Sequence, residues 1–73
     1  DPKTSLQEWA QGRAMPPPVY DETARSGPDH RPVFTVRVTV ESGQTAEATA
    51  PTKRAAEQAA ARQLLERLER EAT

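Results

Sequence analysis

Three segments of the chain have the alternation of apolar and polar residues that is typical of half-buried β-strands. The clearest is residues 34–40, where one phenylalanine and three valines occupy every second position. Residues 45–50 alternate three alanines with polar residues, and Ser42-Gly43 between these two segments predicts a tight hairpin turn. Residues 19–25 predict a further strand, with Tyr20 facing the core.

Two other segments have the three- and four-residue spacing of amphipathic helices. In residues 3–13, Leu6, Trp9 and Ala10 form an apolar stripe, and in residues 52–70 alanines and leucines repeat every four residues. The order of elements is therefore helix, three strands, helix. Because each helix has a single apolar stripe, we predict an α+β fold, α-β-β-β-α, in which the two helices pack on one face of a three-stranded antiparallel sheet.

Length and composition limit what this domain can do. Residues 1–73 are expected to form a single domain, near the lower size at which a chain buries a useful core. The absence of cysteine excludes disulfides and thiolate metal sites, and a single histidine argues against a zinc site. No apolar segment approaches the ~20 residues of a membrane span, so we expect no membrane partner. The chain begins with Asp1 and not with methionine, which suggests a fragment of a longer protein.

A pair of adjacent cations, Lys53 and Arg54, opens the second predicted helix after Pro51 and the expected N-cap Thr52. Cations are unusual there because the helix dipole places partial positive charge at this end. An external anion that docks on the backbone N–H groups and both side chains would explain them; the alternative is a solvated basic surface. The net charge of −1 argues against a strongly basic, non-specific nucleic-acid binder, so any such binding must depend on local charge.

The first predicted helix also carries a polar stripe, formed by Thr4, Gln7, Glu8 and Gln11. It is either an ordinary solvent-exposed face or a surface for sugar hydroxyl groups, because neutral side chains and one carboxylate suit a 2′-OH better than cations do. Residues 26–30, Ser-Gly-Pro-Asp-His, predict a loop from their composition.

Four stretches, DPKTSLQEW, PPVY, GPDH and KRAAEQAAA, together resemble the double-stranded-RNA-binding domain, and most closely the C-terminal one of bacterial ribonuclease III. The resemblance extends from residue 1 to about residue 70. It implies that the domain binds double-stranded RNA by its A-form shape, across two minor grooves and the phosphates of the intervening major groove. The residues that it implicates are Thr4, Gln7 and Glu8 in one minor groove, Gly27, Pro28, Asp29 and His30 in the next, and Lys53 and Arg54 on the phosphates.

One departure from the family pattern concerns the second predicted helix. Many members of the family carry a third cation where this chain has Glu57. The resemblance therefore implies one phosphate contact fewer, with a lower affinity and a flatter salt dependence for the isolated domain. Ribonuclease III domains often have glutamate at this position, so Glu57 agrees with that subfamily.

No set of residues in the chain supports catalysis. Glu8, Glu22 and Asp29 belong to different predicted elements, and His30 has no obvious nucleophile beside it. We therefore expect no cofactor in this fragment, and we expect the fragment to be monomeric. The resembling family cleaves RNA, as in rRNA processing, with a separate Mg²⁺-dependent nuclease domain. The resemblance thus implies a cytoplasmic, homodimeric endoribonuclease as the parent protein, with its N-terminal catalytic domain absent here.

Two other functions stay open. The first is a stand-alone RNA-binding module or RNA chaperone, which predicts the same RNA contacts without a nuclease. The second is a degenerate domain that serves protein–protein contact, which needs an exposed apolar surface. The outward positions of the predicted sheet are polar and give no such surface; they are Thr35, Arg37, Thr39, Glu47 and Thr49.

Overall fold

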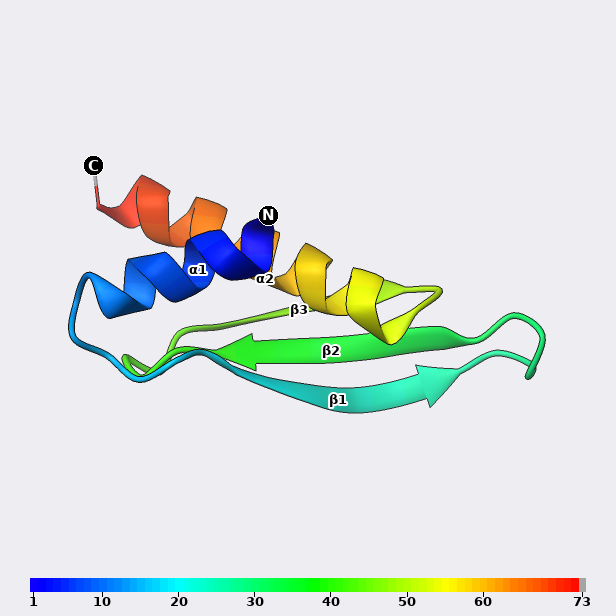
Figure 1. Cartoon of the computed structure of the whole chain (residues 1–73). Coiled ribbons are helices and arrows are strands. Elements are labelled where there is room, and N and C mark those ends of the chain that lie inside the picture. The colour runs from blue at the N-terminus through cyan, green and yellow to red at the C-terminus, as the bar shows by residue number, and fades with distance from the viewer. Residues whose placement is uncertain (73) are drawn as a thin grey trace.

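The computed structural model describes residues 1–72 and has the predicted order of elements. These are α1 (Pro2–Gln11), β1 (Val19–Ser26), β2 (Val33–Thr39), β3 (Thr45–Ala50) and α2 (Lys53–Glu71). The strands form one antiparallel sheet in the order β1-β2-β3, and the helices lie on one face of it (Figure 1). The predicted α-β-β-β-α fold is confirmed, while Thr73, which the domain prediction included, lies outside the described residues.

The hydrophobic core lies between the sheet and the helices. Alanines supply the core side of β3 and much of that of α2, so α2 approaches β2 and β3 closely. Among the described residues every residue that is buried as a whole is apolar, and burial of apolar surface therefore holds these layers together. The buried residues are Leu6, Ala10, Val36, Val38, Val40, Ala46, Ala48, Ala56, Ala60, Ala61, Leu64 and Leu68.

Side-chain caps fix the ends of the helices that carry predicted site residues. At the start of α1, Asp1 Oδ1 accepts a hydrogen bond from Thr4 N at 2.9 Å. At the start of α2, Thr52 is the predicted N-cap, and its Oγ1 accepts a hydrogen bond from Ala55 N at 3.0 Å. Gly12 caps the C-terminal end of α1 after Gln11.

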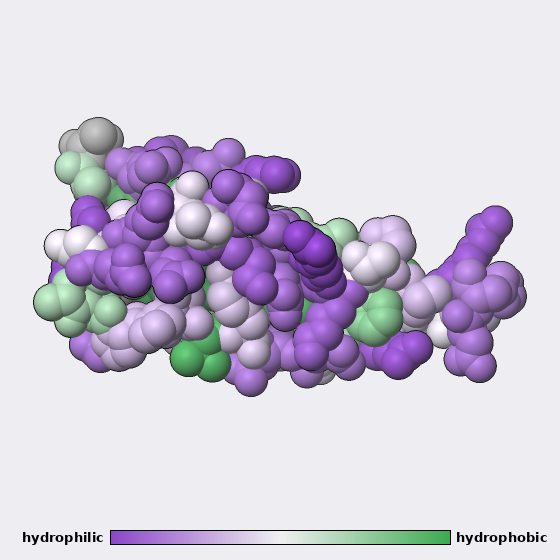
Figure 2. All heavy atoms as spheres, viewed as in Figure 1, coloured by the Kyte–Doolittle hydropathy of each residue, from purple (hydrophilic) through white to green (hydrophobic). Residues whose placement is uncertain are grey.

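The outer half of the β1–β2 hairpin projects beyond the helices (Figure 1), which gives the molecule its elongated extents of 41 × 21 × 19 Å. Phe34, predicted to face the core with the valines of β2, is only half-buried because the helices do not extend over this half. The Arg25 guanidinium instead lies 4.9 Å from the centre of its ring. A β-bulge between Glu22 and Ala24 interrupts the register of β1. Hydrophilic residues cover the tip of the hairpin (Figure 2).

The face of the sheet opposite the helices is polar, as predicted. Arg37 of β2 and Glu47 of β3 are register partners, and Arg37 Nη2 lies 2.7 Å from Glu47 Oε2. The large apolar side chains exposed in the described part of the chain are Val19 and Val33. They lie at opposite ends of the β1–β2 pairing and so form no continuous apolar patch.

Candidate nucleic-acid interface

An open hollow lies between the first turns of α1 and α2, with Tyr20 of β1 in its wall. Four of the nine predicted site residues line it, two of them polar and two of them cations. Residues that α1 contributes to the lining are Lys3, Thr4 and Gln7, and those from α2 are Lys53, Arg54, Glu57 and Gln58. The fold thus brings together residues from opposite ends of the chain.

The basic pair occupies the first two positions of α2. The side chains of Lys53 and Arg54 are exposed, and neither has a hydrogen bond or an ion pair within residues 1–72. The first turn of α2 contains no acidic residue. The first N–H groups of a helix lack intrahelical acceptors, and Thr52 satisfies one of them. This end of α2 therefore offers positive charge and backbone donors to an anion.

The predicted polar stripe of α1 is solvent-exposed. Thr4, Gln7 and Glu8 are exposed, and their side chains make no hydrogen bond to the rest of the described chain. Thr4 and Gln7 line the hollow, whereas Glu8 lies outside its lining. The hydroxyl of Thr4 and the amide of Gln7 can each donate and accept hydrogen bonds, which matches the needs of a sugar 2′-OH.

The loop between β1 and β2 depends on Gly27. Its φ of +82° lies in the left-handed region, and a Cβ at this position would collide with the carbonyl oxygen of Arg31. Arg31 N donates a hydrogen bond to Pro28 O at 2.8 Å, which closes the turn. The side chains of Pro28, Asp29 and His30 are exposed. The loop is thus a defined turn with three exposed side chains.

The nine predicted residues do not form a single site. The loop at residues 27–30 lies at the tip of the projecting hairpin, beyond the ends of both helices (Figure 1). None of its residues lines the hollow between the helices. The structure therefore separates the candidate residues into a hollow and a distal loop.

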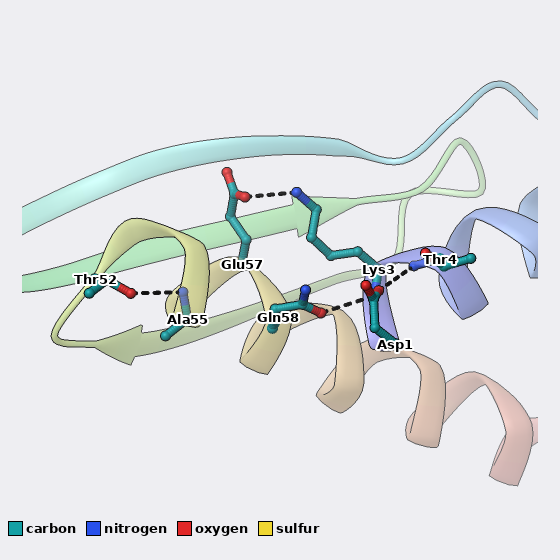
Figure 3. A network of polar contacts seen from close by, with 7 residues as sticks. All are labelled: Asp1, Lys3, Thr4, Thr52, Ala55, Glu57 and Gln58. Atoms are coloured by element: carbon teal, nitrogen blue, oxygen red, sulfur yellow. Dashed lines mark hydrogen bonds and ion pairs between the residues drawn. The ribbon is translucent and has the colours of Figure 1, made fainter.

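Lys3 belongs to the hollow but was not among the predicted site residues. Its Nζ lies 2.8 Å from Glu57 Oε1 and 4.8 Å from the centre of the Tyr20 ring. Its backbone N donates a hydrogen bond to Gln58 Oε1 at 3.3 Å. Figure 3 shows the Lys3 side chain reaching from α1 to Glu57 on α2. No local pattern in the sequence signals this contact, because the two residues are 54 positions apart.

Tyr20 has a strongly perturbed environment at the edge of the hollow. It packs against the core, as predicted, and its hydroxyl is buried without a hydrogen-bond partner in the described chain. Burial, and secondarily the negative charge of Glu57, raise the pKa of Tyr20 to about 12. The neutral phenol is therefore the form that the folded state favours.

This environment predicts a loss of stability at high pH. The unfolded chain releases the Tyr20 proton near pH 10 and the folded chain near pH 12. The contribution of Tyr20 is thus complete below about pH 10 and is lost as the pH rises towards 12. Because Tyr20 is the only tyrosine, tyrosinate absorbance of the folded chain should show a midpoint near 12. Tyr20→Phe should remove this part of the alkaline destabilisation in urea unfolding, whereas a midpoint near 10 in the folded chain would contradict the prediction.

Neither a metal centre nor a membrane span is found in the described chain. Within residues 1–72 no cluster of three or more histidine, cysteine, aspartate or glutamate side chains is arranged to hold a metal ion. In the same range, neither helix combines the length and the apolarity needed to cross a bilayer.

Comparison with known families identifies the family to which the chain belongs. The family model described as "Double-stranded RNA binding motif" matches residues 2–68, so the chain belongs to this family. Among curated proteins it is similar to Ribonuclease 3 of Dinoroseobacter shibae, with 64% identity over 69 residues. It is also similar to Ribonuclease 3 of Jannaschia sp., with 66% identity over 68 residues. These alignments cover 94% and 93% of this chain but only 30% of each relative, so the chain spans about a third of their length.

Solved structures agree with this placement. A structure of Arabidopsis HYL1, described in connection with miRNA processing, matches with a TM-score of 0.77 and 32% identity, over 99% of this chain and 97% of that one. A solution structure of both double-stranded-RNA-binding domains of DRB4 matches with a TM-score of 0.75 and 36% identity, over 93% of this chain and 44% of that one. The fold of this chain is therefore that of the family.

Proposed function

We propose that this domain binds double-stranded RNA by its A-form shape. The observation that carries the proposal is the hollow, where Thr4 and Gln7 of α1 lie beside the unpaired cations Lys53 and Arg54 of α2. Neutral donors and acceptors suit 2′-hydroxyl groups, and adjacent cations at a helix N-terminus suit phosphates. The membership in the double-stranded RNA binding motif family supports the same ligand.

The hollow and the distal loop are separate, and this separation fits a long RNA duplex better than a compact ligand. In our proposal Thr4, Gln7 and Glu8 contact one minor groove, and Lys53 and Arg54 contact phosphates across the major groove. The loop at residues 27–30 then enters the next minor groove from the tip of the projecting hairpin. The elongated shape, 41 Å in its longest extent, supports contacts spread along a duplex. Such contacts read the shape of about 16 bp and depend little on sequence.

The relatives suggest a role within a longer protein. We propose that residues 1–73 are one domain, monomeric by itself, that holds substrate RNA for a dimeric ribonuclease III. In this proposal a separate domain supplies the Mg²⁺-dependent cleavage, and the protein works in the cytoplasm on RNAs such as rRNA precursors. Removal of the domain should then weaken substrate capture. Equal affinity and equal cleavage rate at physiological salt, with and without it, would contradict the proposal.

The RNA-binding proposal is tested by titrating the chain against a 20-bp RNA duplex and the matching DNA duplex over a series of salt concentrations. A-form recognition predicts clear preference for RNA, with an affinity that falls as salt rises because counterions are released from the phosphates. Equal binding of RNA and DNA would reduce the domain to a general polyanion binder. Failure to bind either duplex at low salt would overturn the proposal and favour a role in protein–protein contact.

A further inference from the structure

Lys3 differs from the other two cations of the hollow because its charge is already paired. Its ammonium lies 2.8 Å from the Glu57 carboxylate, and the Lys3 and Glu57 side chains are 36% and 18% exposed. Lys53 and Arg54 line the same hollow, and neither has such a partner within residues 1–72. The three cations are thus neighbours on one surface, but only two of them present an unneutralised charge.

The pairing of Lys3 affects how the surface interacts with phosphate. A salt-dependent contact forms when a cation replaces the counterions of a phosphate. An ammonium held against a carboxylate presents almost no net charge, and the carboxylate itself repels a phosphate that approaches. The Lys3 ammonium can therefore contact a phosphate fully only if the attraction of Glu57 is removed.

The ion pair is not the only contact that holds α1 in place. Gln58 Oε1 accepts a hydrogen bond from the backbone N of Lys3, and Asp1 caps the helix through Thr4 N (Figure 3). One turn further on, Leu6 is completely buried in the core. Neutralising Glu57 therefore leaves the packing of α1 in place and changes mainly the charge beside Lys3.

We propose that Glu57 is a positioning residue that limits the affinity of this surface for duplex RNA, because it withholds the Lys3 ammonium from phosphate. Lys3 is then a third phosphate-binding cation of the hollow, next to Lys53 and Arg54. This inference rests on the proposed RNA-binding function and adds to it the residue pair that sets its strength. The expected ligand group is a backbone phosphate, since the chemistry of Lys3 distinguishes no base.

The test is the salt dependence of RNA binding by Glu57→Gln, which keeps the shape of the side chain and removes its charge. Release of Lys3 should add one phosphate contact, so the slope of log affinity against log salt should steepen by about 0.9 and binding should tighten about three- to tenfold at 0.1 M salt. Glu66→Gln is the matched control, because it removes the same charge from an exposed position of α2 outside the hollow. This control should leave the slope unchanged.

A second variant assigns the effect to Lys3. In the Lys3→Met background, Glu57→Gln should no longer steepen the slope, because the cation that it releases is gone. The inference would be overturned if Glu57→Gln did not change the slope, or if it steepened the slope equally with and without Lys3. In either case, RNA binding by the wild type would still support the proposed function. Absence of wild-type binding at every salt concentration would overturn both. Circular dichroism of each variant identifies any loss of affinity that is due to unfolding.

Discussion

Replacing Lys53 and Arg54 together with alanine is expected to weaken duplex RNA binding about 100-fold. Both side chains are exposed at the start of α2 and line the hollow with Thr4 and Gln7. A charge-assisted contact contributes about 1.4 kcal/mol or more, which corresponds to about tenfold in affinity for each cation. The slope of log affinity against log salt should fall by about two units, because two phosphate contacts are lost.

A matched double variant separates this local effect from a general loss of positive charge. Arg13→Ala combined with Arg67→Ala removes the same charge outside the hollow, since Arg13 follows the end of α1 and Arg67 lies in the C-terminal half of α2. It should reduce the affinity only slightly and keep a preference for RNA. Equal losses in the two double variants would show that the start of α2 has no special role.

Most of the fold could be predicted because local periodicity and the core coincide. Val36 and Val38 of β2 and the four-residue repeat of α2 face the core as their spacing indicates. Phe34 is the exception, since its position in the alternating pattern is that of a core residue while its surroundings are not. Periodicity identifies the face of a strand, but it does not show how far the helices extend over that strand. The overhang of the hairpin is a tertiary property that no local pattern encodes.

In the candidate site too, local features could be predicted from the sequence and tertiary contacts could not. The N-cap Thr52 and the loop around Gly27 could be predicted because the residue types at these positions favour a particular local backbone structure. The contact between Lys3 and Glu57 could not be predicted, because it joins two helices through residues that are 54 positions apart in the sequence. From the sequence, Glu57 was only a carboxylate close to the expected duplex. The structure adds that this carboxylate has a cation as its partner, which changes the expected result of replacing it.

The stability of the site depends on how α1 is attached to the rest of the domain. The part of α1 that carries Thr4 and Gln7 is anchored by Leu6, which is fully buried and belongs to the same core cluster as Leu64 and Val38. The free energy of unfolding of a domain of this size is only about 3–10 kcal/mol. Trp9 also packs against this cluster, but Leu6 is the large side chain of α1 that is fully buried, so the position of the polar stripe relative to the cations of α2 relies mainly on Leu6.

Leu6→Ala is accordingly expected to lower the free energy of unfolding by about 2–5 kcal/mol, through lost burial and the cavity left behind. The Tm in a thermal melt should fall by more than about 10 °C. Val19→Ala is the control, because Val19 is 57% exposed and its truncation should change stability by less than about 0.5 kcal/mol. Duplex RNA should raise the Tm of Leu6→Ala, since a ligand that binds only the folded state stabilises that state. A melt of Leu6→Ala that matches wild type would show that α1 is anchored mainly by its polar contacts to α2.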